Sequence, residues 1–235
     1  MNKLAIVALV AAAWFWWTKD PSVSVSNGQV DFGYKIEYPH GDDNGSRLPM
    51  LVALHGNGDT AKNFYATALD QIKTSVRVVL LKGPISYRGG GAWPNNRDEL
   101  RRYGKAVNEA VMAIAAKYPT VGKPALLGFS GGAVMAYYQA AVYGDSYSYI
   151  FPVSGGLDKA VLEGEKARPG ARVYAFHGKQ DSVLSFNGGQ QAVDLLFARK
   201  VRVKFTPFDG GHHGIFQEMK PQISALVGDK LARVN

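Results

Sequence analysis

Short apolar runs alternate with helix-forming stretches along most of this chain, and this alternation constrains its fold more than any other feature. Apolar runs typical of buried strands lie at residues 49–54, 76–81, 124–127, 147–153, 172–176 and 201–205. Stretches that favour helices follow them at residues 60–73, 98–117, 133–142, 158–167, 190–200 and 216–231. Strand patterns at residues 22–26 and 29–38 precede the series. This order predicts a mainly parallel α/β sheet with helices on both faces and functional residues at the carboxyl ends of its strands.

Length and composition are those of one globular domain. The chain has 235 residues, of which 46% are hydrophobic and 20% charged, and no linker divides it. We therefore expect residues 21–235 to form a single domain. The absence of cysteine excludes disulfides, thiolate metal sites and a cysteine nucleophile. The net charge of +8 indicates a basic surface, and because no nucleic-acid-binding motif accompanies it, we expect no nucleic-acid partner.

The amino terminus differs from the rest of the chain. Lys3 precedes an uninterrupted apolar run over residues 4–17. The run is shorter than the roughly 20 residues of a membrane-spanning helix, and it fits the apolar part of an export signal. Its tryptophans favour a membrane interface, so an uncleaved anchor stays open as the alternative. We expect residues 1–20 to be an export signal or short membrane anchor. The protein would then be periplasmic, secreted or held at a membrane through residues 4–17.

A G-x-S-x-G sequence at residues 128–132 lies between a predicted strand and a predicted helix. In that context a serine occupies a sharp turn that exposes its hydroxyl above the sheet, with backbone strain of roughly 1–3 kcal/mol. Glycines on both sides of the serine let the strand and the helix approach each other. Ser130 is therefore the candidate nucleophile.

A serine nucleophile needs a base to accept its proton and a third group to orient that base. His212 and His213 follow the last predicted strand on a glycine-flanked loop, where an imidazole can reach Ser130. We favour His212 as the base and keep His213 as the alternative. For the acid we favour Asp181, which follows the preceding strand, over Asp158. The order Ser, Asp, His along the chain is that of one large group of hydrolases.

The turn after the first buried strand, residues 55–58, supplies further candidates. Acyl transfer needs N–H donors for the oxyanion that develops on the substrate. The backbone amides of Asn57 in this turn, and of Gly131 directly after the serine, are the candidate donors. The turn also imitates a dinucleotide-binding pattern, but the next strand ends without the acidic residue that such a site requires. The paired histidines lack a third metal ligand at a recognised spacing, so we expect neither a metal nor a cofactor.

Together these residues resemble the α/β-hydrolase superfamily, and within it the compact carboxylesterase/phospholipase-type esterases and their dienelactone-hydrolase-like relatives. The resemblance covers about residues 29–231 and rests on residues 54–58, 128–132, 177–181 and 210–212. It implies a three-layer fold, a Ser130–His212–Asp181 triad, and Asn57 and Gly131 as oxyanion donors. Dienelactone hydrolases use a cysteine nucleophile, which this chain lacks, so their activity is not implied.

The resemblance implies a serine hydrolase that cleaves small-molecule carboxylic esters through an acyl-enzyme. The segment between Gly156 and Arg172 is too short for a large cap domain, so we expect an open site and short or accessible acyl chains. Trp93, Phe129 and Tyr87 are candidates for the substrate pocket, although a core or surface location explains each of them equally well. A serine peptidase or acyltransferase on the same fold, and a non-catalytic binding protein, are the alternative functions.

Overall fold

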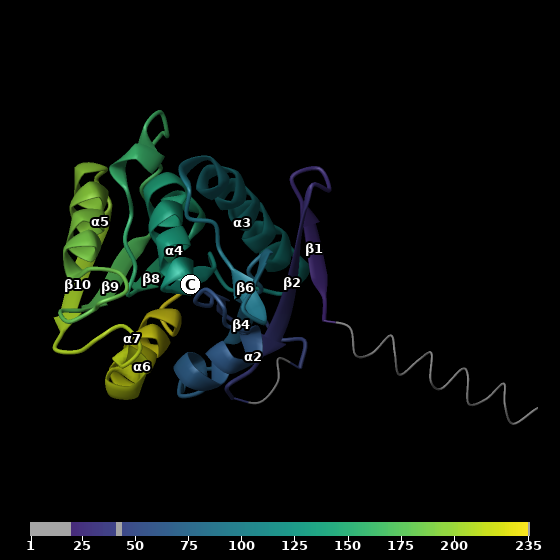
Figure 1. Cartoon of the computed structure of the whole chain (residues 1–235). Coiled ribbons are helices and arrows are strands. Elements are labelled where there is room, and N and C mark those ends of the chain that lie inside the picture. The colour runs from purple at the N-terminus through teal and green to yellow at the C-terminus, as the bar shows by residue number, and fades with distance from the viewer. Residues whose placement is uncertain (1–19, 41–43, 235) are drawn as a thin grey trace, which may run out of the picture.

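A computed structural model describes residues 20–40 and 44–234 (Figure 1). Within these residues, eight strands form one sheet in the order β1-β2-β4-β3-β7-β8-β9-β10. The strands are β1 (Ser22–Val25), β2 (Val30–Glu37), β3 (Met50–Leu54), β4 (Arg77–Leu81), β7 (Ala125–Phe129), β8 (Tyr149–Val153), β9 (Arg172–Gly178) and β10 (Arg202–Phe208). The β1–β2 and β2–β4 pairs are antiparallel, and the other pairs of this sheet are parallel. The expected mainly parallel α/β architecture is confirmed.

Helices cover both faces of this sheet, which gives the molecule three layers (Figure 1). One face carries α3 (Arg97–Lys117), α4 (Gly131–Val142) and α5 (Phe186–Ala198), and the other carries α2 (Ala61–Phe64), α6 (Ile215–Glu218) and α7 (Lys220–Leu231). Successive residues of a strand point to opposite faces. In β3, Val52 therefore packs in the core under α3 to α5, whereas Leu51 and Ala53 pack in the core under α2, α6 and α7. Burial on both faces explains why β3 and β4 read as continuous apolar runs.

Side-chain caps fix where the longer helices begin. Asn96 accepts a hydrogen bond from the Glu99 amide at 3.0 Å at the start of α3, and Ser185 accepts one from the Gly188 amide at 3.2 Å at the start of α5. The helix α5 thus begins before residue 190, where the sequence predicted its start. Gly188 and Gly189 near its start weaken the helix pattern in the sequence. One of them, Gly189, packs against the ring of a buried histidine, and a Cβ atom at this position would overlap that ring.

Other segments also differ from the sequence-based expectation. The helix expected over residues 60–73 is shorter, because α2 continues only as a π-helical turn, Tyr65–Leu69. The loop at residues 83–96 contains a hairpin of β5 (Ile85–Tyr87) and β6 (Gly90–Ala92). The helix expected over residues 158–167 is a short 3-10 helix, Lys159–Leu162. The last helix is divided into α6 and α7, because Pro221 lacks an N–H and occupies the first turn of a new helix.

The segment between β8 and β9 contains this short 3-10 helix and, as expected, no large cap domain. The predicted export signal or membrane anchor, residues 1–20, lies outside the described residues apart from Asp20. Among the helices of residues 20–40 and 44–234, none combines the length and the apolar character needed to cross a membrane.

Candidate active site

Ser130 lies in the turn between β7 and α4, at the carboxyl end of a strand in the middle of the sheet. Its φ of 53° and ψ of −117° form a strained backbone conformation that non-glycine residues rarely adopt. The turn has no room for side chains on either side, because a Cβ at Gly128 would overlap the carbonyl of Gly132, and a Cβ at Gly132 would overlap the carbonyl of Leu54. Ser130 occupies the N-cap position of α4 without capping it, which leaves its hydroxyl for another partner.

His212 connects Ser130 to Asp181 through two hydrogen bonds. Its Nε2 lies 2.9 Å from Ser130 Oγ, and its Nδ1 lies 2.7 Å from Asp181 Oδ2. Because a carboxylate only accepts, the Nδ1–H donates to Asp181 and Nε2 accepts the serine proton. The three side chains come from the carboxyl ends of β7, β9 and β10, in one half of the sheet. An imidazole in this arrangement can take the proton of the serine hydroxyl as its oxygen attacks a carbonyl.

Asp181 is fixed through both of its carboxylate oxygens. Its Oδ1 accepts hydrogen bonds of 2.9 Å from the backbone amides of Val183 and Leu184. Its Oδ2 faces His212 and also lies 3.3 Å from Nε2 of the buried His177, which donates to the Leu184 carbonyl. Burial alone would raise the pKa of Asp181, but the His212 hydrogen bond and the two amides together lower it below its ordinary value. The carboxylate is therefore ionised and oriented toward the imidazole.

The environment of His212 favours its neutral form. The residue is 4% exposed, and its ring packs against that of Phe129 with the ring centres 5.1 Å apart. Burial lowers the pKa of His212 by more than the hydrogen bond and charge of Asp181 raise it, and the nearby His213 and His177 lower it further. The neutral imidazole is the form that accepts a proton, so His212 is ready to act as a base at neutral pH.

Asn57 and Gly131 meet beside the serine. A Cβ atom at Gly131 would overlap the side-chain amide of Asn57. The Asn57 Oδ1 accepts a hydrogen bond of 2.9 Å from the backbone amide of Trp93. Within the described part of the chain, no hydrogen bond uses the backbone N–H of Asn57 or that of Gly131. Both amides are therefore free to bind an oxyanion on a substrate carbonyl.

His55 fastens the Asn57 turn to the end of β4. Its Nε2 accepts a hydrogen bond of 2.9 Å from the Gly83 amide, so its Nδ1 carries the proton and donates to the Gly56 carbonyl at 2.7 Å. Burial lowers the pKa of His55 by more than the Gly56 hydrogen bond and the charge of Asp59 raise it. The bond from Gly83 needs the neutral ring, because a protonated Nε2 cannot accept a hydrogen bond. The sequence shows that His55 begins the turn, but it does not show the contact with Gly83, which lies 28 positions away.

The aromatic residues considered for the substrate pocket lie in different places. Trp93 is 2% exposed, and its indole N–H donates to the His55 carbonyl at 2.8 Å. Its ring belongs to the core, which corrects its assignment to a pocket: the indole packs inward because its N–H has a buried acceptor there. Phe129 is partly buried beside His212, and Tyr87 is 42% exposed on the β5–β6 hairpin. These two retain surface that a ligand can contact.

The alternative base and acid lie away from the serine hydroxyl. His213 is exposed, and its ring meets that of His212 edge-on, with the centres 5.1 Å apart. Asp158 accepts a hydrogen bond of 2.8 Å from the Ala160 amide and so caps the short 3-10 helix. In residues 20–40 and 44–234, neither side chain forms a hydrogen bond with Ser130. No group of His, Asp and Glu in these same residues is placed to bind a metal ion.

Comparisons with known proteins relate this chain to one family. Residues 101–227, which include Ser130, Asp181 and His212, match the phospholipase/carboxylesterase family. Similar solved structures include a Bacillus cereus carboxylesterase, with 17% identity and a TM-score of 0.66 over 83% of this chain and 94% of that one. Esterase PE8 is 19% identical, with a TM-score of 0.67 over 91% of this chain and 99% of that one. The acyl-protein thioesterase 2 of Zea mays is 20% identical, with a TM-score of 0.59 over 84% and 98%.

No curated protein sequence matches the chain. At these low identities the solved structures establish the fold, whereas the sequence match itself extends over more than half of the chain. The protein therefore belongs to the phospholipase/carboxylesterase family and has an α/β-hydrolase fold.

Proposed function

We propose that this protein hydrolyses carboxylic esters through an acyl-enzyme formed on Ser130. The observation that carries this proposal is the pair of hydrogen bonds, 2.9 Å and 2.7 Å long, that link Ser130 to His212 and His212 to Asp181. Membership of the phospholipase/carboxylesterase family supports esterase chemistry at this site.

In the proposed reaction, Ser130 Oγ attacks the ester carbonyl carbon while His212 Nε2 takes its proton. The carbonyl oxygen becomes an oxyanion, which accepts hydrogen bonds from the Asn57 and Gly131 amides. The carbon–oxygen bond to the alcohol then breaks, and the alcohol leaves with the proton from His212. A water molecule attacks the acyl-enzyme with His212 again as base, which releases the acid and restores the serine.

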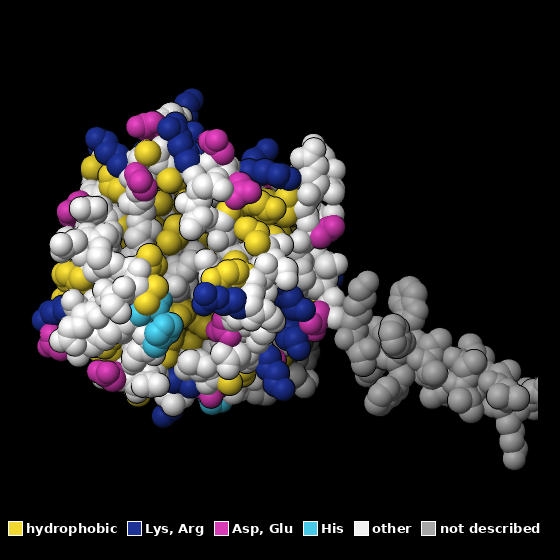
Figure 2. Space-filling model, in the orientation of Figure 1, with side chains coloured by type: hydrophobic (Ala, Val, Ile, Leu, Met, Phe, Trp, Pro, Cys, Tyr) yellow, Lys and Arg dark blue, Asp and Glu magenta, His cyan; other side chains and the backbone are white. Residues whose placement is uncertain are grey.

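The surroundings of the site favour short or accessible acyl chains. No cap domain lies between β8 and β9. Histidine and hydrophobic side chains lie next to each other on the surface that Figure 2 shows. Val183, two residues after Asp181, is 55% exposed and offers an apolar contact to a short acyl chain. We therefore expect acetyl and butyryl esters to be better substrates than long-chain esters.

Labelling with a fluorophosphonate tests the nucleophile. We expect the folded protein to gain one label at Ser130, identified by peptide mass, and the Ser130→Ala variant to gain none. Ser182→Ala is the matched control, because Ser182 is an exposed serine beside the acid and should leave labelling unchanged. Labelling of Ser130→Ala at the wild-type rate would show that another residue is the nucleophile.

Substrate comparison then tests the reaction class. The proposal predicts that p-nitrophenyl acetate is cleaved much faster than the matching p-nitroanilide, because an amide needs stronger protonation of its leaving group. A preference for the amide would favour a serine peptidase. Faster consumption of the ester with an added alcohol than with water, together with formation of a new ester, would favour an acyltransferase.

A further inference from the structure

A cavity lies beside the turn that begins at His55. Its volume is about 380 Å³. It is bounded by β2, the turn after β3, the end of β4 and the β5–β6 hairpin. The residues that line it include Lys35, His55, Asp59, Thr60, Lys62, Lys82, Gly83, Ser86 and Gly91. The ester reaction proposed above uses none of these side chains directly.

Positive charge dominates the walls of this cavity. Three lysines line it: Lys35, Lys62 and Lys82. Asp20 lies 2.6 Å from the ammonium of Lys82 and 3.6 Å from that of Lys35, so one carboxylate is shared by two cations. Lys62 is exposed and has no ion pair within the described residues.

The acidic residue of the cavity is already engaged by neighbouring groups. Asp59 Oδ1 accepts hydrogen bonds of 2.7 Å from the Thr60 amide and from the side-chain amide of Asn63. These bonds hold the carboxylate at its own turn but leave its negative charge in the cavity wall. Three lysines against the two carboxylates of Asp20 and Asp59 leave one positive charge in excess, which favours an anionic ligand.

The chemistry of the donors favours a phosphoryl group over other anions. Lysine binds phosphate as a point charge, whereas a planar carboxylate is better matched by the fork of an arginine. No arginine lines this cavity, but the hydroxyls of Thr60 and Ser86 do. The backbone also approaches closely, because a Cβ at Gly91 would lie 2.7 Å from the Gly83 carbonyl oxygen. A group with several oxygens can use the ammonium and hydroxyl donors together.

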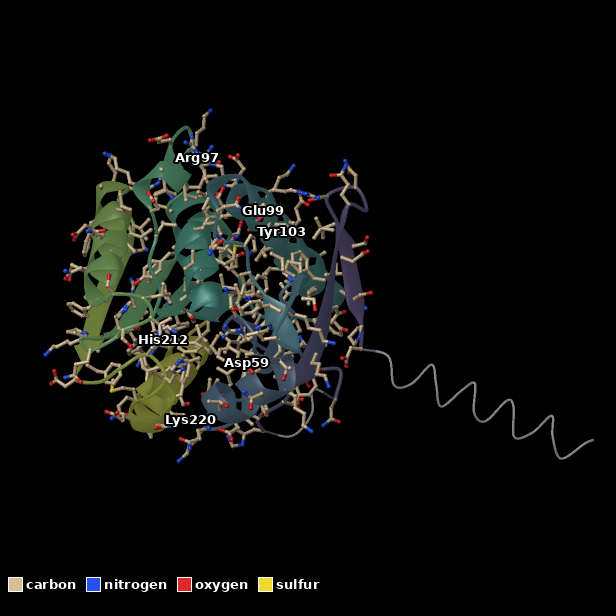
Figure 3. All side chains as sticks on the ribbon, viewed as in Figure 1. Asp59, Arg97, Glu99, Tyr103, His212 and Lys220 are labelled. Atoms are coloured by element: carbon tan, nitrogen blue, oxygen red, sulfur yellow. The ribbon has the colours of Figure 1, made fainter. Side chains whose placement is uncertain are left out.

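The position of the cavity links it to the candidate active site. His55 forms part of its wall, and a Cβ atom on the next residue, Gly56, would lie 3.5 Å from the Cβ of Ser130. In the view of Figure 3, Asp59 and His212 lie in the same part of the molecule. Figure 2 shows Lys and Arg side chains gathered on this face beside the histidines. The cavity and Ser130 therefore both adjoin the turn that begins at His55.

We propose that this lysine cavity binds a phosphoryl group carried by the ester substrate. The inference rests on the proposed esterase function, because it takes the ligand to be an ester substrate. The binding itself can be measured without catalysis. The phosphoryl group is supplied either by a soluble phosphorylated ester or by the headgroup of a phospholipid. The experiments below separate these two sources.

Calorimetric titration of the Ser130→Ala variant with sn-glycerol 3-phosphate tests the binding site alone. We expect saturable binding that glycerol does not show. Adding Lys62→Gln or Lys82→Gln should weaken it roughly fivefold each, as the loss of one nearby charge in water predicts. Lys204→Gln is the matched control, because Lys204 is exposed on the edge strand β10 and should leave the affinity unchanged. Equal affinity in all of these variants, or no binding at all, would overturn the proposal. Because Lys62 is exposed, its replacement should leave the fold intact. A loss of affinity in this variant therefore reports a loss of binding and not of folding.

Kinetics with two matched esters test whether the cavity serves the reaction. We expect the wild-type protein to hydrolyse 1-acetylglycerol 3-phosphate with a kcat/KM roughly tenfold above that for 1-acetylglycerol. The Lys62→Gln, Lys82→Gln double variant should lose this preference while it keeps full activity on the neutral ester. If the protein hydrolyses neither ester but still binds glycerol phosphate, the esterase function is rejected and the anion-binding site is retained. If the double variant prefers the phosphorylated ester as strongly as the wild type does, the cavity does not bind the phosphoryl group of the substrate.

Vesicle sedimentation identifies the source of the phosphoryl group. The full-length protein is mixed with phosphatidylglycerol or phosphatidylcholine vesicles. A phospholipid headgroup as ligand predicts that the double variant binds phosphatidylglycerol more weakly than Lys204→Gln does. A soluble ester as ligand predicts equal vesicle binding by these variants, with the kinetic difference retained.

Discussion

The side-chain oxygen of Asn57 accepts a hydrogen bond of 2.9 Å from the backbone amide of Trp93, whose ring is buried in the core. The candidate oxyanion turn is thus fastened to the β6 end of the hairpin loop. It is fastened a second time by His55, which bonds the Gly83 amide at the other end of the same loop. The position of the Asn57 amide therefore depends on contacts with a segment far away in the sequence.

Replacing Asn57 by alanine should lower activity more than stability. The Asn57→Ala variant keeps its backbone N–H but loses the hydrogen bond that holds the turn. We expect kcat for p-nitrophenyl acetate to fall roughly 10- to 100-fold, since a displacement of about 1 Å has effects of this size. The matched control is Asn96→Ala, which removes the cap of α3 and should lower the melting temperature without changing kcat. A parallel loss of kcat in both variants would contradict the assignment.

The two adjacent histidines should behave very differently. We expect His212→Ala to lower kcat/KM roughly 10⁴- to 10⁶-fold, as the loss of a general base does in serine hydrolases. His213→Ala should stay within about threefold of the wild type, because its exposed ring contacts His212 only edge-on. The measurement is hydrolysis of p-nitrophenyl acetate by variants whose circular dichroism matches the wild type. The reverse pattern would assign the base to His213.

Activity should fall on the acidic side of neutrality. Burial lowers the pKa of His212 below its ordinary value of 6.5, and only the neutral ring accepts the serine proton. The profile of kcat/KM against pH should therefore have an acidic limb with an apparent pKa below 6.5. Replacing Asp181 by asparagine removes an interaction that raises the His212 pKa, so the limb should move to still lower pH while the maximum rate falls. A midpoint above 6.5 in the wild type would contradict this account.

How much of this site the sequence could reveal depends on how far apart the interacting residues are. Ser130, Asp181 and His212 each follow a predicted strand, so the parallel arrangement alone indicates that they lie at one edge of the sheet. The structure brings them within hydrogen-bond distance. The buried strands were equally accessible to prediction, because their apolar runs reflect burial on both faces.

Long-range contacts explain what the sequence could not reveal. Trp93 was open to a pocket, core or surface location, because the acceptor of its indole N–H is 38 positions away in the sequence. The start of α5 was missed because Gly188 and Gly189 usually weaken helices, whereas here Gly189 makes room for a histidine ring. The lysine cavity has no local pattern either, since its lysines come from β2, from α2 and from the residue after β4.

Stability should also depend on pH through His55. The folded-state pKa of His55 lies below that of the unfolded chain, so the unfolded chain binds a proton more readily. This contribution to stability is complete above the ordinary value of 6.5 and decreases as the pH falls below it. We expect the urea midpoint of the wild type to decrease between neutral pH and about pH 5, and to decrease less in His55→Gln.

His212 also has a lowered pKa and contributes with the same sign, so the comparison uses the difference between wild type and variant at each pH. The lowered pKa of Asp181 does not interfere, because its effect is confined to pH values below its ordinary pKa of 3.8. Identical pH dependence in wild type and His55→Gln would show that the ring is not buried in its neutral form.

The close contact between Gly132 and the Leu54 carbonyl limits which substitutions this site can accept over evolution. The groups that would bind the oxyanion are main-chain amides, held where α4 presses directly on β3. A side-chain deletion leaves these amides in place, except at Asn57, whose side chain holds the turn. A methyl group added at Gly132 would overlap the Leu54 carbonyl, so α4 and β3 would move apart and the Gly131 amide would shift with them. New substrate preferences must then arise in segments that do not touch the contact, such as the β5–β6 hairpin and the chain between β8 and β9.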